Sequence, residues 1–168
     1  NFLRSRNSPS PSQEEGWGGV VGDFCLAIFG ASQPEIPLVL NCPVYYLGKF
    51  TDDVALSIVY SAADVTVVPS VQDNLPNTVL ESLACGTPVV AYKIGGMADM
   101  IEHQKNGYLA KPFEIEDLAN GIKWILDLDH ENYQKLSKRA REKCEQEFSI
   151  EIQAKKYLDL YNKIVNII

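Results

Sequence analysis

The stretch DVTVVPSVQDNLPNTVLESLACGTPVVAY, residues 64–92, contains a strand, a helix and a second strand in direct succession. Residues 64–70 and 88–92 are short, Val-rich runs with the composition of buried strands. Between them, residues 77–85 have the apolar spacing of a helix, which Gly86 and Pro88 bring to an end. A strand–helix–strand unit of this length predicts two parallel strands joined by a crossover helix.

The rest of the chain continues this alternation. Residues 23–31 and 44–48 are short apolar runs typical of strands. Asp52 and Asp53 precede an apolar helical pattern, where the helix dipole favours acids. Because several strands are nearly all apolar, we predict an α/β fold, a Rossmann-like parallel sheet with helices on both faces. The remaining predicted elements are a short helix at 97–102, a strand at 106–110 and helices at 114–126, 130–148 and 150–168.

Composition divides the chain into three parts. Residues 1–22 are rich in Ser, Pro and Gly and have no hydrophobic period, so we expect a poorly ordered leader or remnant there. Residues 23–148 contain all the predicted strands and would form the Rossmann-like domain. Residues 149–168 would form a separate final helix, whose apolar positions recur every three or four residues as one stripe.

Charge and cysteine usage exclude several classes of function. The net charge of −7 gives no general electrostatic reason to bind nucleic acid. The four cysteines form no CxxC pair and the two histidines are isolated, so we expect no metal site. No apolar run approaches the roughly 20 residues needed to cross a bilayer. We therefore expect a soluble, cytoplasmic protein.

Positive charge is concentrated near the carboxyl end of the chain. More than half of the Lys and Arg residues lie between Lys135 and Lys163. A solvated helix face explains this pattern most simply. The alternative is peripheral contact with an anionic membrane surface or partner.

Two polar turns follow the third and fourth predicted strands. Residues 70–77 come directly after one strand, and Gly95 and Gly96 come shortly after the next. In parallel α/β sheets, ligands bind outside the carboxyl ends of the strands. We therefore expect both turns to open on the same edge of the sheet.

The first turn has the chemistry of a phosphate and hydroxyl site. Pro76, Asn77 and Thr78 begin a helix, so several backbone N–H groups there lack partners within the helix and suit an anion. Glu81, one turn further on, can accept hydrogen bonds from the vicinal hydroxyls of a ribose, and Asp73 can reach hydroxyls at the other end of a ligand. Two alternatives stay open. Glu81 can be the partner of Thr78 in a capping box, and Asp73 with Asn74 can simply form a turn.

Residues 64–112 closely resemble the carboxyl-terminal domain of the family 4 retaining glycosyltransferases. The motifs that carry the resemblance are a strand ending in PS, the acids Asp73 and Glu81, the CGTPVV strand, and GG with an acid shortly after it. YLGKFTDDVALSIVYSAADV upstream and EDLANGIKWIL downstream are also similar to the family, so the match covers roughly residues 24–127. The resemblance implies one half of a B-type glycosyltransferase fold, in which two Rossmann-like domains face each other across a cleft.

The family also implies roles for individual residues. Asp73 would be the catalytic-site acid that contacts the donor sugar, and Glu81 would hold the ribose of the nucleotide. Residues on strand ends and turns would surround the rest of the donor. They are Tyr46, Leu47 and Gly48 beside the base, Asn74, Leu75, Pro76, Asn77 and Thr78 at the diphosphate, and Gly95 and Gly96 at the diphosphate and sugar. No cofactor is implied, since these enzymes usually stabilise the departing diphosphate without a bound metal.

The sequence departs from the family pattern in three respects. Asp73 stands where the family more often has Glu, which shortens the reach by one methylene. The Arg and Lys that the family supplies early in this domain have no counterpart before Asp23, and Lys49 does not replace them by position. The acceptor-binding amino-terminal domain is missing, so we expect a fragment that binds the donor weakly, is inactive alone and can self-associate through its final helix, which crosses to that domain in the family.

These features predict the donor-binding domain of a transferase that moves a hexose from a nucleotide diphosphate sugar to a saccharide or lipid-linked acceptor. A sugar-nucleotide epimerase would need acids placed for proton abstraction, and we see no such constellation. A non-catalytic, glycosyltransferase-like module that binds nucleotide sugar or acts as a scaffold is the alternative, which the missing basic pair favours and the retained Asp73 and Glu81 oppose.

Overall fold

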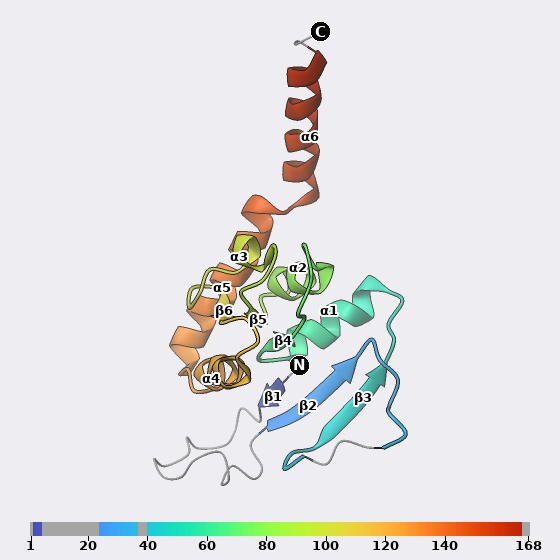
Figure 1. Cartoon of the computed structure of the whole chain (residues 1–168), viewed down its shortest axis with the longest axis vertical. Coiled ribbons are helices and arrows are strands. Elements are labelled where there is room, and N and C mark those ends of the chain that lie inside the picture. Colours follow the sequence, from blue (N-terminus) through green and yellow to red (C-terminus); the bar gives the residue numbers. More distant parts are fainter. Residues whose placement is uncertain (1, 5–23, 37–39, 166–168) are drawn as a thin grey trace.

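The computed structural model describes residues 2–4, 24–36 and 40–165 (Figure 1). Strands and helices alternate from β3 to α4, as the sequence predicts, and apart from β1 the observed bounds differ from the predicted ones by a few residues at most. The elements are β1 (Phe2–Arg4), β2 (Phe24–Phe29), β3 (Val44–Gly48), α1 (Asp53–Ala62), β4 (Thr66–Val68), α2 (Asn77–Ala84), β5 (Val89–Tyr92), α3 (Met97–Met100), β6 (Gly107–Ala110), α4 (Ile115–Leu126), α5 (His130–Glu147) and α6 (Ile150–Val165).

The described strands form two three-stranded sheets, whereas we predicted one. Their orders are β1-β2-β3 and β4-β5-β6, and all pairs are parallel except β1 with β2. The sheets also differ in how they are covered. In β3, Tyr45 and Leu47 are exposed while Val44 and Tyr46 are half-buried, whereas every residue of β5 is buried. Strand β3 therefore has one exposed face, as in a strand packed on one side, whereas β5 is covered on both faces.

Strand β1 lies within the stretch expected to be a poorly ordered leader. Phe2–Arg4 pair antiparallel with β2, with Leu3 opposite Cys25. Without β1, strand β2 would be an edge strand with unpaired N–H and C=O groups on that side, and pairing with β1 satisfies them. The leader prediction did not include this strand, and residue 1 and residues 5–23 lie outside the described part of the chain. The division into three domains, with the leader as the first, stays a prediction.

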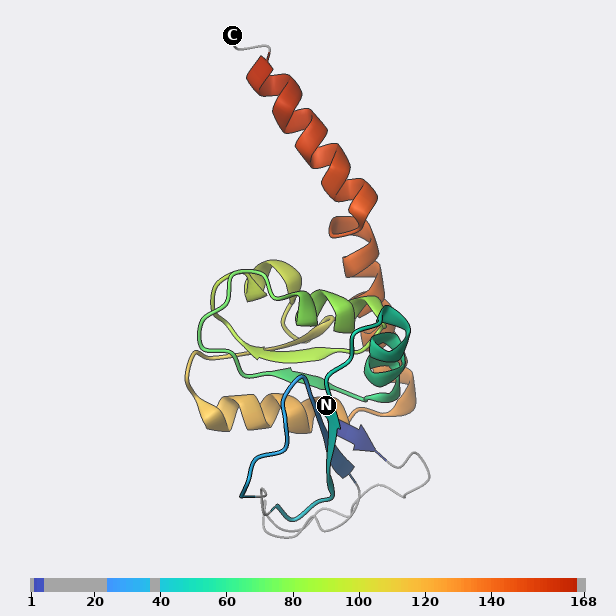
Figure 2. The same cartoon turned by 90° about the vertical axis from the view of Figure 1, so that its right-hand side faces the viewer.

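The core lies on both faces of the second sheet. Along β5, Val89 and Ala91 face one apolar cluster, and Val90 and Tyr92 face the other, as the two-residue period of a strand requires. The first cluster includes residues of α2, α3 and α5, and the second includes residues of α4 (Figure 2). This three-layer packing confirms the α/β class and fixes both ends of α2, the helix that carries the candidate site.

Helix α2 ends where the sequence predicts. Gly86 has a φ of +75°, a left-handed conformation that glycine adopts without cost. Its N–H donates to the carbonyl of Leu83 at 2.9 Å, and the N–H of Thr87 donates to the carbonyl of Ser82 at 2.9 Å. These bonds close the last turn of α2 and lead the chain directly into β5.

Helix α6 extends away from the body of the molecule (Figure 1). None of the side chains described in α6 is buried, and within the described part of the chain the helix packs mainly against α5. The apolar stripe predicted for this helix is present, and much of it is exposed. Within the described residues, no helix is both long and apolar enough to span a membrane.

Candidate functional site

The turns after β4 and β5 lie against each other at the carboxyl edge of the second sheet, as predicted. The N–H of Gly96 donates to the carbonyl of Asn74 at 2.7 Å. Gly95 has a φ of +53°, and a Cβ there would collide with the carbonyl of Asp73. A Cβ on Gly96 would collide with the carbonyl of Asn74. Both glycines are therefore required for the close approach of the two turns.

The start of α2 faces this edge. Its N-cap is Pro76, and no side chain caps the helix there. The first helical bond in this turn runs from the N–H of Val79 to the carbonyl of Pro76, at 3.0 Å. The N–H groups of Asn77 and Thr78, which come before Val79, have no acceptor four residues earlier within the helix, and Asn77 is exposed. Such an end can bind an anion.

Glu81 does not form the capping box that its spacing from Thr78 allows. The helix begins at Asn77, so Thr78 is already inside its first turn and cannot be the N-cap. Instead, an oxygen of the Glu81 carboxylate (Oε2) accepts a hydrogen bond from the hydroxyl of Tyr60 at 2.9 Å. Glu81 is exposed, which leaves the rest of its carboxylate accessible to a ligand.

Asp73 is half-buried in the turn after β4, and its neighbours Asn74 and Leu75 are exposed. The contact of its backbone with Gly95 fixes the position of the turn. This contact is also what a simple turn former would make, so the role of the Asp73 side chain in the donor site stays a prediction.

The residues predicted to flank the base are at the end of β3. The hydroxyl of Tyr46 is buried and, among the described residues, has no hydrogen-bond partner. Gly48 pairs with Phe29, and the Phe29 ring contacts the Tyr60 ring edge-on, at 5.3 Å between centroids. Tyr60 therefore connects this strand end to Glu81, although the two residues of the hydrogen bond are 21 positions apart in sequence.

Tyr60 is the residue of this site that sequence reasoning missed. It is 1% exposed, at the carboxyl end of α1. Burial, followed by the hydrogen bond to Glu81, raises its pKa above the usual value, so the phenol stays protonated and remains a donor. The only signal in the sequence was an apolar-face position on α1, which does not identify a partner.

Residues 41–143 match the family described as glycosyl transferases group 1. The chain belongs to this family. The predicted resemblance is thereby confirmed.

Three related proteins illustrate the similarity of this glycosyltransferase domain. Sulfoquinovosyl transferase SQD2 of Arabidopsis thaliana is 35% identical over 111 residues, covering 64% of this chain and 21% of that protein. Sucrose-phosphate synthase from Thermosynechococcus elongatus has a TM-score of 0.66 at 34% identity, covering 74% of this chain and 31% of that one. Anabaena HepE in complex with UDP-glucose has a TM-score of 0.61 at 28% identity, covering 71% and 32%. The chain thus spans about a fifth to a third of these relatives.

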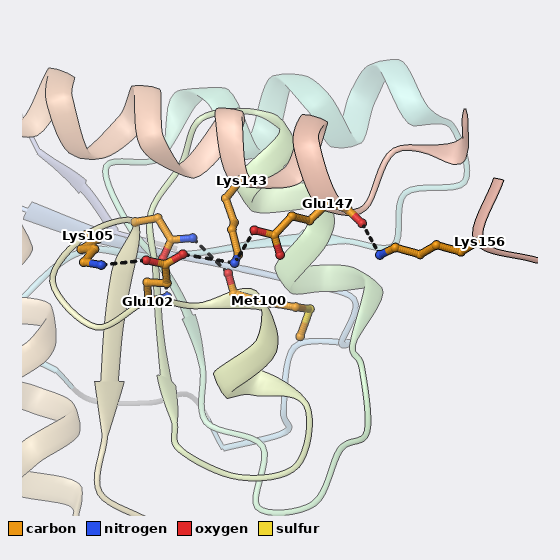
Figure 3. A network of polar contacts seen from close by, with 7 residues as sticks. Met100, Glu102, Lys105, Lys143, Glu147 and Lys156 are labelled. Carbon is orange, nitrogen blue, oxygen red and sulfur yellow. Dashed lines mark hydrogen bonds and ion pairs between the residues drawn. The ribbon is translucent and has the colours of Figure 1, made fainter. Parts of the chain in front are cut away.

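A second group of charged residues lies away from the candidate site, where α5 meets the loop after α3 (Figure 3). The ammonium of Lys143 donates to Glu102 at 3.1 Å and to Glu147 at 2.7 Å, and Lys105 donates to Glu102 at 3.0 Å. Lys156 of α6 donates to the carbonyl of Glu147 at 3.1 Å. The bonds of Lys143 and Lys105 pair these cations with acids, and together with the Lys156 bond they join α5, α6 and the loop. The group therefore has a structural role.

No three His, Cys, Asp or Glu side chains in the described part of the chain lie together in a way that could hold a metal ion. The expectation that no metal is used stays a prediction.

Proposed function

We propose that this chain is the donor-binding part of a retaining glycosyltransferase, which transfers a hexose from a nucleotide diphosphate sugar to a saccharide or lipid-linked acceptor. One observation carries the proposal. The start of α2, which leads to Glu81, lies beside the Gly95–Gly96 turn at one edge of the second sheet. Family membership supports the reaction class, and the complex of Anabaena HepE with UDP-glucose supports this type of donor.

The diphosphate would lie at the start of α2. Free N–H groups and the positive end of the helix dipole favour its negative charge, and each charge-assisted hydrogen bond contributes about 1.5–3 kcal/mol. The same groups would stabilise the charge that develops on the diphosphate as the sugar departs. In this arrangement Asn74, Leu75, Pro76, Asn77 and Thr78 surround the phosphates.

The two acids would bind the two ends of the donor. Glu81 would accept hydrogen bonds from the ribose, and Asp73 would contact the hydroxyls of the sugar. The close contact of Gly95 and Gly96 with the turn of Asp73 leaves backbone, without side chains, beside the sugar. Tyr46, Leu47 and Gly48 would flank the base.

The proposal is tested by the affinity of the chain for nucleotides. Titration calorimetry with uridine, guanosine and adenosine diphosphates, without added metal, should detect binding of at least one of them. Glu81→Gln should weaken that binding by about 1–3 kcal/mol and change the free energy of unfolding little. Glu116→Gln, which alters another exposed acid, is the matched control and should leave affinity unchanged. No binding by any of the three diphosphates, or full affinity in Glu81→Gln, would contradict the proposed site.

A non-catalytic module that binds nucleotide sugar is the second candidate, and the missing Arg and Lys favour it. An assay of the full-length protein separates the two. Transfer of labelled sugar supports the enzyme, and binding of donor without transfer supports the module.

A further inference from the structure

Tyr60 is held in place by its surroundings. Its side chain is 1% exposed, and the Phe29 ring packs against it edge-on, with an angle of 88° between the ring planes. Phe29 in turn contacts Phe50, at 6.2 Å between ring centroids. A ring confined in this way cannot change rotamer without opening the contact between α1 and the first sheet.

The backbone of Tyr60 is fixed as well. The hydroxyl of Thr87 donates to the Tyr60 carbonyl at 2.7 Å. Thr87 is joined to α2, because the Ser82 hydroxyl donates to its carbonyl at 2.9 Å. The hydroxyl oxygens of Ser82 and Thr66 are 2.8 Å apart. Ser82, Thr87 and Thr66 are all at most 2% exposed, so this hydroxyl network is isolated from water.

Ser82 directly follows Glu81 on α2, so Tyr60 is connected to this part of the helix twice. One connection runs through the backbone and the buried hydroxyls, and the other is the bond from the Tyr60 hydroxyl to Glu81. A long, exposed Glu side chain normally samples several rotamers, and ordering it on binding costs free energy. A hydrogen bond from a rigid phenol removes much of that freedom before the ligand arrives.

We propose that Tyr60 is a positioning residue, which holds one carboxylate oxygen of Glu81 so that the remaining acceptor sites face the ribose hydroxyls of the nucleotide. This inference rests on the proposed function, in which Glu81 binds the ribose. In this role α1 pre-organises the recognition of the ribose, and the helix itself need not touch the nucleotide. Through Phe29 the same residue sets the distance between the base-flanking end of β3 and the ribose acid.

The test compares nucleoside diphosphates that differ only in the ribose. The dissociation constants of uridine diphosphate and of its 2′,3′-dideoxy analogue are measured for the unmodified chain and for Tyr60→Phe, with the guanosine or adenosine pair used if that base binds best. The unmodified chain should prefer the intact ribose. Tyr60→Phe, which removes only the hydroxyl, should weaken binding of the intact nucleotide about threefold to tenfold and leave the dideoxy analogue unchanged. A loss of general packing would weaken both.

Two further variants isolate the hydroxyl. Tyr133→Phe removes another phenol donor, which bonds to the Asp64 carbonyl at 3.1 Å at the amino end of β4, and should keep the full preference. In a Glu81→Ala background, which leaves the Tyr60 hydroxyl without a side-chain acceptor at position 81, Tyr60→Phe should have no further effect on affinity.

The outcomes separate the two proposals. If the unmodified chain does not distinguish the intact from the dideoxy nucleotide, the ribose assignment of Glu81 fails, and the role of Tyr60 fails with it. If the chain does distinguish them and Tyr60→Phe retains the preference, only the role of Tyr60 is overturned. If Tyr60→Phe does not fold, the ring carbon signal of Tyr60 in the unmodified chain decides. It should shift on addition of the intact nucleotide and not of the dideoxy analogue, and an unmoved signal overturns the inference.

Discussion

At Glu81, a single hydrogen bond separates two interpretations of one motif. The sequence TVLE allows a capping box, but Pro76 is the N-cap of α2. The Glu81 carboxylate accepts a hydrogen bond from the Tyr60 hydroxyl instead. Local spacing predicted that Glu81 would lie one turn into the helix, and it does. It could not identify Tyr60, because that contact depends on how α1 packs against α2. The sequence predicted that the turns of Asp73 and Gly95 would lie on the same edge of the sheet, but it did not predict their direct contact.

A prediction at the residue scale concerns Gly95. Gly95→Ala forces a Cβ into the Asp73 carbonyl at a φ of +53°, so it should lower the free energy of unfolding by about 2–3 kcal/mol and weaken nucleotide binding. Gly30→Ala is the matched control, since Gly30 also has a positive φ but nothing lies within 4 Å of its Cβ position. It should cost about 1 kcal/mol and leave binding unchanged. Urea unfolding of both variants measures the difference, and equal costs would show that the collision has no effect.

Among the elements, β3 and β5 show what a sequence pattern can and cannot predict. The bounds of β3 agree with the predicted run of residues 44–48, and β5 lies within its predicted range. The separation of the strands into two sheets was not predicted, because pairing between strands depends on contacts distant in sequence. The same is true of β1, whose short apolar segment has no period long enough to reveal a strand.

At the element scale, we predict how the contact between α5 and the loop after α3 contributes to stability. Lys143 is 14% exposed and pairs with Glu102 and Glu147, so Lys143→Met should lower the free energy of unfolding at pH 7 by about 1 kcal/mol. Lys138→Met is the control, because Lys138 is 76% exposed and 3.7 Å from Glu142, and it should change stability by less than about 0.5 kcal/mol. Comparable losses in the two variants would contradict the structural role of Lys143.

The stability that this contact contributes should depend on pH. Hydrogen bonds from Lys105 and then Lys143 lower the pKa of Glu102 from its usual value. Ionised Glu102 therefore stabilises the fold above the pKa of the unfolded chain, about 4.3, and this contribution is lost as pH falls through the lower folded pKa. The cost of Lys143→Met, measured by urea unfolding, should thus be largest near neutral pH and shrink below about pH 4. A cost that stays constant down to pH 3 would refute this linkage.

At the scale of the whole molecule, the final helix α6 is the element whose apolar side chains are most exposed to solvent. Tyr157, Leu158, Tyr161, Ile164 and Val165 of α6 are all 48% exposed or more. Exposed apolar area of a few hundred Å² usually marks an interaction surface. The helical period predicted this stripe, but its lack of cover followed from the family resemblance and could not be derived from the period. Peripheral contact with an anionic membrane stays a prediction, although several cations of α5 pair with acids on the same helix, as a solvated face would.

We therefore expect the chain either to self-associate through α6 or to leave the end of that helix in rapid exchange with solvent. Light scattering of the chain and of a Leu158→Lys, Tyr161→Lys variant measures the first, since the charges should restore a monomer. Hydrogen exchange measures the second. A monomer whose last helical amides are fully protected would show that the stripe is covered within one molecule.

The central claim, that the start of α2 binds the diphosphate of a sugar nucleotide, is tested most directly by the backbone amide NMR spectrum. Saturating nucleoside diphosphate should shift the amide signals of Asn74, Leu75, Asn77 and Thr78, together with those of Gly95 and Gly96, while the charged group around Lys143 stays unmoved. Shifts confined to another part of the chain, with the signals at the start of α2 unchanged, would contradict the claim.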